Sequence, residues 1–378
     1  MDKWLVMSFA IMGCCTCLMA KGEEKRIPAK GFAVFDDSGE FKPFEFTRRP
    51  VGDNDILIEI MYAGICHSDV HHVRQDWGKT QFPTVPGHEI AGRVIQVGKD
   101  VTQFKVGDYA GVGCWIASCS DCDYCKTEME HLCKKRVLSF ASVDHTEHDE
   151  PTYGGYSSNY VISEDFAVKI PQNVPMERVA PLLCAGITTY TPIRFSDTQK
   201  GDKVGVAGFG GLGHMAVKYA VSLGADVVVF DITEEKREDA LRMGAKKYVN
   251  VNKPEDLEGL EDSLDLIIDT IPFQHDPLMY LQMLKLNGEM AIVGLPPNAE
   301  VPMIPTSALP MLPLRKVYGS NTGSIRQTQE MMDYSVSHEL YPDVKIIPAD
   351  GKAITEAYQK IIDGEVKFRY VIDMGTLE

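Results

Sequence analysis

Short apolar runs, separated by glycines and polar turns, fill the chain from residue 27 to about residue 113. They lie at residues 31–35, 44–46, 56–60, 92–98 and 106–113. Runs of this length between Gly, Asn and Asp residues are typical of β-strands joined by turns. The pattern predicts an irregular β domain in the first half of the chain.

The pattern changes after Pro181, where apolar runs suited to strands alternate with stretches suited to helices. The first unit combines a strand at 203–207, a helix at about 214–223 and a second strand at 227–230. Further strands are predicted at 264–269, 290–293 and 317–318. Strands that alternate with helices form parallel sheets with helical crossovers. We therefore expect an α/β fold with a doubly wound parallel sheet in the second half.

Two domains suit a chain of 378 residues, which is too long for one compact core. The tail from about residue 324 mixes helix and strand and is expected to return to the first domain. The predicted boundaries are therefore an N-terminal segment at 1–25, a β domain at 26–180 and 323–378, and an α/β domain at 181–322.

The N-terminal segment contains an uncharged run at residues 4–20, between Lys3 and the charged stretch 21–26. A helix of that length would span about 25 Å, short for a membrane crossing but sufficient for the core of an export signal. Residues 1–25 are therefore interpreted as a leader or a disordered N-terminus and are left out of the fold argument. Export or membrane anchoring through this leader is the alternative to a cytoplasmic location.

The net charge of −16 limits the partners of the chain. Nucleic acid and anionic membranes are polyanions, so they would repel this surface. We expect a small-molecule substrate and no nucleic-acid partner. A homodimer or homotetramer is the expected form.

Four cysteines fall at short fixed steps, and this spacing in a long chain indicates a metal rather than a disulfide framework. They are Cys119, Cys122, Cys125 and Cys133. Four thiolates in one small lobe fit a closed, tetrahedral structural zinc. An iron–sulfur cluster is the alternative, but in bacterial ferredoxins the fourth cysteine follows after three residues and precedes Pro, whereas Cys133 follows after seven and precedes Lys134.

A second set consists of Cys66, His88 and Cys184. Each alone is more often a buried core residue than a ligand. Here Gly64 and Gly87 allow tight backbone turns beside the ligands, and Cys184 lies where the two predicted domains join. Two thiolates and a neutral imidazole would leave zinc one open position, which is typical of a catalytic site.

A glycine-rich motif follows the strand predicted at 203–207 and begins the next helix. Its residues are Gly208, Phe209, Gly210, Gly211, Leu212 and Gly213. Asp231 lies at the end of the next predicted strand, eighteen residues beyond the last of them. This arrangement predicts a Rossmann domain that binds a dinucleotide at the helix N-terminus. A carboxylate at Asp231 favours NAD over NADP, and the first cations after it are Lys236 and Arg237.

These motifs together resemble those of the zinc-dependent medium-chain alcohol dehydrogenases, and among them the aldehyde reductases of cinnamyl-alcohol dehydrogenase type. The likeness extends from about residue 25 to the C-terminus. It rests on Gly87-His-Glu-x2-Gly92-x5-Gly98, on residues 64–69, 180–190 and 208–214, and on the four-cysteine lobe. It implies a GroES-like, zinc-binding catalytic domain beside the Rossmann domain, and two zinc ions per chain.

The resemblance also implies roles for single residues. Glu89 would act as an alternating fourth ligand of the catalytic zinc. Ser68 would hydrogen-bond the substrate oxygen and pass its proton through the cofactor ribose to His71. Further residues would border the cofactor: Lys236, Thr270, Gly294, Ser320, Asn321 and Thr322. Many relatives of this type carry a small hydroxyl residue in place of Asp231 and use NADP, so the resemblance favours NADP where the carboxylate favours NAD.

The function that we expect is reversible hydride transfer between NAD(P)(H) and a primary alcohol and its aldehyde. Trp77 and Trp115 are candidates to line an apolar slot for aromatic or medium aliphatic aldehydes. The nearest alternative is a polyol or secondary-alcohol dehydrogenase. An alternative of another class is a zinc and dinucleotide-binding or redox-sensing protein without catalysis.

Overall fold

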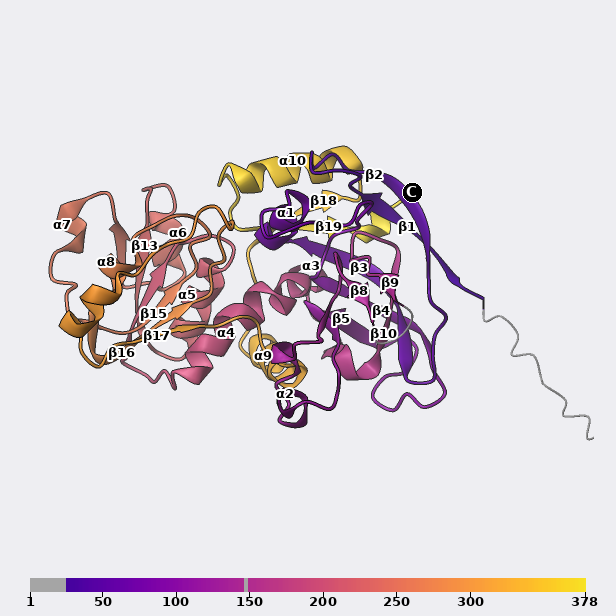
Figure 1. Cartoon of the computed structure of the whole chain (residues 1–378), viewed down its shortest axis with the longest axis horizontal. Helices are drawn as coiled ribbons and strands as arrows, with labels where there is room; N and C mark the ends of the chain where they lie inside the picture. The colour runs from indigo at the N-terminus through magenta and orange to yellow at the C-terminus, as the bar shows by residue number, and fades with distance from the viewer. Residues whose placement is uncertain (1–24, 146–148) are drawn as a thin grey trace, which may run out of the picture.

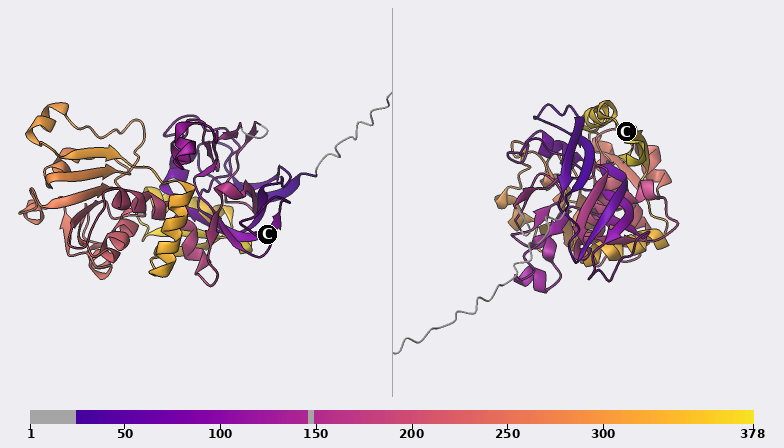
Figure 2. Two further views of the ribbon diagram at one scale, coloured as in Figure 1. Left: turned by 90° about the horizontal axis from the view of Figure 1, so that it is seen from below. Right: turned by 90° about the vertical axis from the view of Figure 1, so that its right-hand side faces the viewer.

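The computed structural model describes residues 25–145 and 149–378. Two large sheets lie side by side along the molecule, each with buried apolar residues of its own (Figures 1 and 2). The leader predicted at 1–25 lies, up to residue 24, outside the described residues. In the part of the chain that the structure describes, no helix is long and apolar enough to cross a membrane.

The first sheet has seven strands in the order β11-β5-β4-β3-β19-β18, with β10 also paired to β3. The bounds are β3 Asp55–Ile65, β4 Ile90–Val97, β5 Tyr109–Val112, β10 Asn159–Ser163, β11 Val168–Ile170, β18 Val344–Pro348 and β19 Arg369–Asp373. Smaller pairs are β1 Ile27–Ala33 with β2 Lys42–Arg48, β6 Trp115–Ala117 with β7 Val137–Leu138, and β8 Val143–Asp144 with β9 Glu150–Pro151. In β3, Ile56, Leu57, Ile58 and Ile60 are buried while Glu59 is exposed, so both faces of this strand are covered along most of its first half.

The C-terminal tail completes this first sheet. Strand β19 pairs antiparallel with β3, so that Tyr370 lies opposite Ile65. Helix α10, Gly351–Ile362, covers one side of these strands and contacts α1, His67–Val73 (Figure 1). The tail therefore contributes strands to the first sheet.

The second sheet is parallel throughout and has the strand order β14-β13-β12-β15-β16-β17. The bounds are β12 Lys203–Ala207, β13 Asp226–Asp231, β14 Lys247–Asn250, β15 Leu264–Asp269, β16 Leu284–Ile292 and β17 Lys316–Gly319. This is the strand order of a Rossmann domain, so the predicted fold class is confirmed. Strand β14, in which Tyr248 and Val249 are the apolar residues between Lys247 and Asn250, is not among the strands predicted from the sequence.

Most of the remaining helices surround the second sheet or join the two sheets. They are α2 Asp123–Lys126, α3 Met176–Val179, α4 Ala185–Phe195, α5 Gly213–Ser222, α6 Arg237–Arg242, α7 Pro254–Leu257, α8 Pro277–Leu281 and α9 Ile325–Ser337. Helix α4 packs against both α5 and α9 between the two sheets (Figure 1).

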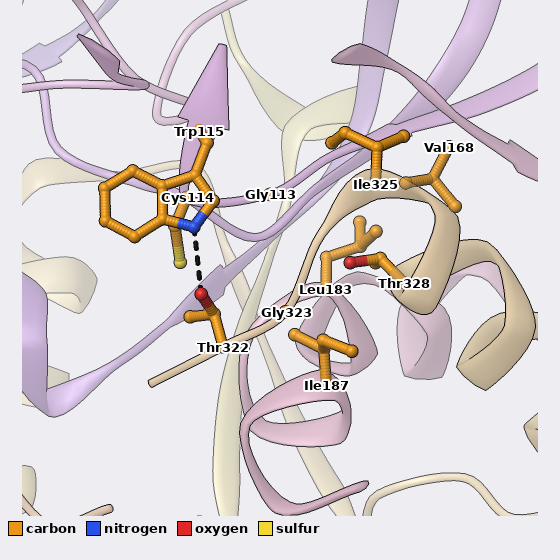
Figure 3. Close-up of a pocket in the computed structure, with 10 residues that line it drawn as sticks. All are labelled: Gly113, Cys114, Trp115, Val168, Leu183, Ile187, Thr322, Gly323, Ile325 and Thr328. Atoms are coloured by element: carbon orange, nitrogen blue, oxygen red, sulfur yellow. Dashed lines mark hydrogen bonds between the residues drawn. The ribbon is translucent and has the colours of Figure 1, made fainter. Parts of the chain in front are cut away.

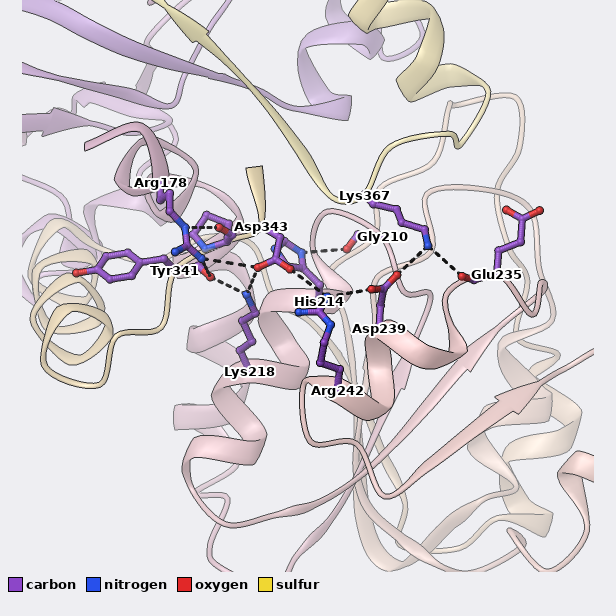
Figure 4. Close-up of polar contacts among 11 residues, drawn as sticks. Arg178, Gly210, His214, Lys218, Glu235, Asp239, Arg242, Tyr341, Asp343 and Lys367 are labelled. Carbon is purple, nitrogen blue, oxygen red and sulfur yellow. Dashed lines mark hydrogen bonds and ion pairs between the residues drawn. The ribbon is translucent and has the colours of Figure 1, made fainter. Parts of the chain in front are cut away.

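Polar contacts also join the tail to the second sheet, around Asp343 (Figure 4). The Asp343 carboxylate accepts a 2.7 Å hydrogen bond from Lys218 of α5 and lies near Arg178 and Arg242. Its backbone oxygen accepts hydrogen bonds from the amides of Phe368 and Arg369. Asp343 therefore connects the helix that follows the glycine-rich motif to the strand that carries Arg369.

Candidate active site and metal centres

Three separate segments bring four potential metal ligands together. Cys66 is the N-cap residue of α1, Cys184 is the N-cap residue of α4, and His88 with Glu89 directly precedes β4. All four residues are buried, and one ligand atom from each lies within 4.8 Å of the others. The Sγ atoms of Cys66 and Cys184 are 3.9 Å apart. Two thiolates on one tetrahedral zinc lie about 3.8 Å apart when each Zn–S bond is about 2.3 Å, so the donor set fits zinc.

The imidazole of His88 is oriented by a carboxylate behind it. Asp69, on α1, is fully buried, and its Oδ1 lies 2.9 Å from Nδ1 of His88. Oδ2 of the same carboxylate accepts a 2.8 Å hydrogen bond from the amide of Cys66. Because an ionised carboxylate only accepts hydrogen bonds, Nδ1 carries the proton and Nε2 keeps its lone pair for a metal.

The four-cysteine lobe forms a second candidate metal centre. The Sγ–Sγ distances are 3.9 Å between Cys119 and Cys125, 3.5 Å between Cys122 and Cys125, and 3.5 Å between Cys119 and Cys133. All four sulfurs lie within 4.8 Å of one another, which suits one tetrahedral ion better than a cluster whose cysteines bind separate irons. The lobe contacts the start of α9, where Glu130 accepts a 2.5 Å hydrogen bond from the amide of Ile325.

The glycine-rich motif forms a tight turn between β12 and α5. Gly208 has φ of +82°, and a Cβ on Gly213 would lie 1.9 Å from the carbonyl oxygen of Gly208. A Cβ on Gly210 would meet no atom within 4 Å, so this residue faces open space. The glycine-rich turn therefore leaves room for a phosphate group at the N-terminus of α5. The hydroxyl of Thr270 closes the other side with 2.9 Å hydrogen bonds to the carbonyl oxygens of Ala207 and Gly208.

Comparison with known proteins agrees with this geometry. The alcohol dehydrogenase GroES-like domain matches residues 52–172, and the zinc-binding dehydrogenase family matches residues 211–337. Cinnamyl alcohol dehydrogenase 2 of Rauvolfia serpentina is 42% identical over 95% of this chain and 99% of its own length. The chain belongs to the zinc-dependent alcohol dehydrogenases. The resemblance predicted from the motifs is thereby confirmed.

Two further relatives are similar to this dehydrogenase over most of their length. Mannitol dehydrogenase of Petroselinum crispum is 43% identical over 88% of this chain and 98% of the relative. The crystal structure of CAD from Helicobacter pylori complexed with NADP(H) has 49% identity and a TM-score of 0.89, covering 93% of this chain and 99% of that one.

An arginine that the sequence analysis missed lies between the two parts of the dehydrogenase site. Arg369 begins β19 and is buried, and its guanidinium donates to the fully buried carboxylate of Glu89. Nη1 of Arg369 is 3.9 Å from Sγ of Cys66. The same nitrogen would lie 2.9 Å from a Cβ on Gly211. One side chain therefore contacts both the metal-ligand cluster and the glycine-rich motif.

The cysteines near the candidate catalytic site change one another's pKa values. The pKa of the Cys66 thiol is lowered well below its ordinary value by its hydrogen bond with Cys184, and also by the charge of Arg369. Cys114, which precedes β6, interacts with Cys184 as well, and this interaction lowers the pKa of the Cys114 thiol. The sequence analysis did not single out Cys114, because it lies outside both ligand patterns.

Ser68 and His71, the expected relay residues, both lie on α1. The Oγ of Ser68 is 3.6 Å from Sγ of Cys66, which places this hydroxyl beside the metal-ligand cluster. His71 is buried, its Nδ1 lies 2.7 Å from a carboxylate oxygen of Asp76, and its Nε2 has no hydrogen-bond partner among the described residues. A buried ring nitrogen without a partner is uncommon, and it gives His71 a free position for a ligand hydroxyl.

Asp231 lies at the carboxyl end of β13, beside the glycine-rich motif. Its Oδ2 accepts a 3.0 Å hydrogen bond from the amide of Phe209, and Oδ1 accepts a 2.7 Å hydrogen bond from the amide of Ile232. Nζ of Lys236 is 3.9 Å from Oδ2. The structure therefore adds a cation beside the carboxylate, whereas Arg237 is occupied by Glu234 and other partners.

The residues expected at the other end of the cofactor lie just after two neighbouring strands of the second sheet. Gly294 follows β16, and a Cβ there would lie 2.4 Å from the carbonyl oxygen of Ile271. The run Ser320, Asn321 and Thr322 follows β17. Thr322 is buried, and its Oγ1 accepts a 2.9 Å hydrogen bond from the indole of Trp115 (Figure 3). Trp115 therefore holds this run against the wall of a small cavity that Cys114 also lines.

Trp77, the other tryptophan considered for substrate contacts, connects the two halves of the dehydrogenase. Its indole donates a 3.0 Å hydrogen bond to the carbonyl oxygen of Pro296, and its ring packs against His71 and His72. The neighbouring carbonyl oxygen of Asp76 accepts a hydrogen bond from the amide of Asn298. These contacts hold the loop after α1 against the second half of the chain.

Proposed function

We propose that the chain catalyses reversible hydride transfer between a nicotinamide dinucleotide and a primary alcohol and its aldehyde. The observation that carries the proposal is the position of Arg369, which contacts the cluster of buried ligands and the glycine-rich motif at once. A metal site and a dinucleotide site that share one side chain are close enough to act on the same substrate.

Cys66, His88 and Cys184 would hold the catalytic zinc, with Glu89 as an alternating fourth ligand, and the four-cysteine lobe would hold a structural zinc. Zinc bound at the first site would supply Lewis acidity toward the alcohol or carbonyl oxygen, and the nicotinamide would supply the hydride acceptor or donor. Asp69 keeps the imidazole of His88 in the tautomer that binds a metal.

The proton of the alcohol needs a path from the buried site to solvent. We assign its first acceptor to the Ser68 hydroxyl and its later acceptor to Nε2 of His71, with a cofactor hydroxyl between them. Asp76 holds Nδ1 of His71, so that Nε2 is the nitrogen able to exchange the proton.

Two observations bear on the choice of carrier. Asp231 favours NAD, because its carboxylate accepts a ribose hydroxyl and repels a 2′-phosphate. Lys236 beside it and the NADP(H) in the Helicobacter pylori relative favour NADP. We propose that both carriers are used and that Asp231 shifts the preference toward NAD.

Aromatic or medium aliphatic aldehydes are the proposed substrates. The name of the Rauvolfia serpentina relative supports this class, and the aromatic side chains of Trp77 and Phe140 lie beside His72 near the candidate metal ligands. The second candidate is a polyol, favoured by the name of the Petroselinum crispum relative.

A coupled assay of the purified chain tests these proposals. NADH and NADPH are each combined with benzaldehyde, cinnamaldehyde and hexanal, and NAD and NADP with mannitol and sorbitol. Reduction of the aldehydes with two zinc ions per chain is the expected result. Turnover of the polyols alone would favour the second candidate, and one zinc per chain without turnover would favour the non-catalytic alternative.

We infer that the enzyme is a homodimer joined through β17 and the segment before it. Strand β17 is at the edge of the second sheet, and one of its sides pairs with no strand among the described residues. Val301, Met303, Met311 and Leu314 precede it and are all exposed, Met311 by 80%. An edge strand beside exposed apolar residues is typical of a subunit interface.

The seven free cysteines of the described chain favour a reducing compartment, and we propose the cytoplasm.

A further inference from the structure

A pair of buried tyrosines lies behind the candidate catalytic ligands. Tyr156 precedes β10 and Tyr358 is on α10, and both side chains are almost fully buried. Their hydroxyl oxygens are 3.3 Å apart, and the hydroxyl of Tyr156 is 3.1 Å from Oδ2 of Asp69. The pair therefore ends on the same carboxylate that orients His88.

The direction of these hydrogen bonds follows from the chemistry of the carboxylate. Asp69 accepts from Nδ1 of His88, from the amide of Cys66 and, at 3.3 Å, from the amide of Gly87. Because a carboxylate only accepts, Tyr156 donates to Asp69, and its own oxygen is then free to accept from Tyr358. Burial, and then the charge of Asp69, raises the pKa of both tyrosines well above the ordinary value, so both hydroxyls keep their protons.

Packing fixes the tyrosine rings in this position. Gly87 has φ of +108°, and a Cβ there would lie 2.7 Å from Cδ1 and 2.8 Å from Cε1 of Tyr156. The absence of a side chain at Gly87 therefore lets the ring of Tyr156 approach the backbone next to His88. The ring of Phe41 contacts both tyrosines, at centroid distances of 5.9 Å and 4.8 Å.

We propose that Tyr156 and Tyr358 are positioning residues that control, through Asp69, how strongly His88 and Cys66 hold the catalytic zinc. The inference rests on the zinc site of the proposed function. The hydrogen bond from Tyr156 holds the Asp69 carboxylate in the orientation in which it accepts from both the imidazole of His88 and the amide of Cys66. The hydrogen bond from Tyr358 polarises the Tyr156 hydroxyl and so strengthens the hydrogen bond from Tyr156 to Asp69.

Zinc release measures this effect directly. Zinc-loaded protein is mixed with a chromogenic chelator, and the phase that belongs to the catalytic zinc is identified as the one missing in Cys66→Ser. We expect Tyr156→Phe to release this zinc about 10-fold faster, because loss of a partner behind a metal ligand typically lowers metal affinity or activity by about 10–100-fold. Tyr358→Phe should change the rate in the same direction but less, because the bond from Tyr156 to Asp69 remains.

A matched control separates positioning from general loosening of the core. Tyr160 is equally buried in the same domain, and its hydroxyl donates a 2.8 Å hydrogen bond to the carbonyl oxygen of Ser139, away from Asp69. Tyr160→Phe should release zinc at the wild-type rate. The visible spectrum of cobalt-substituted protein, which reports the ligand field, should change in Tyr156→Phe and not in Tyr160→Phe.

Two results would overturn the proposal. One is wild-type zinc release and an unchanged cobalt spectrum in both Tyr156→Phe and Tyr358→Phe. The other is an equal effect of Tyr160→Phe. Failure of the proposed function is a separate result, because it would appear in the wild-type protein as the absence of a catalytic zinc or of turnover.

Discussion

Arg369→Met removes the positive partner of a carboxylate that has no contact with solvent. Arg369 is 5% exposed and Glu89 is 0% exposed, so water screens their interaction very little. Removal of one partner from a buried ion pair costs about 3–5 kcal/mol, because the remaining charge stays buried without compensation. Met is an unbranched apolar side chain that replaces the aliphatic part of the arginine. We expect protein stripped of metal to lose this amount from its free energy of unfolding.

The same substitution should cost less in zinc-loaded protein. Glu89 belongs to the set of four ligands, so a bound cation would provide it with a second positive neighbour. The double variant Arg369→Met/Glu89→Gln should recover most of the loss, because it leaves no unpaired buried charge. Urea unfolding followed by tryptophan fluorescence, with and without metal, measures all of these differences.

An exposed ion pair supplies the control for this experiment. Arg194 lies 3.2 Å from Glu330, and these side chains are 53% and 43% exposed. Arg194→Met should cost at most about 1 kcal/mol, the usual value for a pair in solvent. If Arg369→Met costs no more than this control in metal-stripped protein, or if the losses of Arg369→Met and Glu89→Gln simply add, the reasoning from buried charge is wrong.

Four further substitutions test the site and the domain junction. Cys66→Ser should abolish turnover in a folded protein, whereas Cys122→Ser should mainly lower the melting temperature; equal loss of folding in both would contradict separate catalytic and structural zinc sites. Asp231→Ser should raise the ratio of kcat/KM for NADPH over NADH, and an unchanged ratio would show that other residues decide. Burial alone would raise the pKa of Asp343, but the hydrogen bond and the charge of Lys218, together with the charge of Arg242, outweigh it and lower this pKa. Asp343→Asn should therefore be less stable than wild type at pH 7. The difference in free energy of unfolding should shrink as the pH falls below about 3.9, the pKa of Asp in the unfolded chain, and disappear below the lower pKa of the folded protein. A difference that stays constant between pH 7 and pH 2 would contradict this.

The sequence could predict those parts of the site whose neighbours in the chain form a recognisable motif. Gly64 lies two residues before Cys66, Gly87 directly precedes His88, and the glycine-rich motif lies between a clear strand and a clear helix. The parallel strands were predicted from their apolar runs, except for β14, which was not recognised in the sequence. The local sequence pattern was sufficient to predict these strands and motifs because each is formed by residues that are adjacent in the chain.

The missed residues act through contacts that no local pattern records. Arg369 is separated from Glu89 by 280 positions, and Tyr358 from Tyr156 by 202. Both come from the tail, which has no cysteine and no glycine-rich motif to mark it as part of the site. An arginine and a tyrosine of this kind are found more often at surfaces or in ordinary cores than at metal centres. Only the pairing of β19 with β3, and the packing of α10 on α1, give them a role. Sequence motifs alone are therefore a poor guide to what the tail contributes to this site.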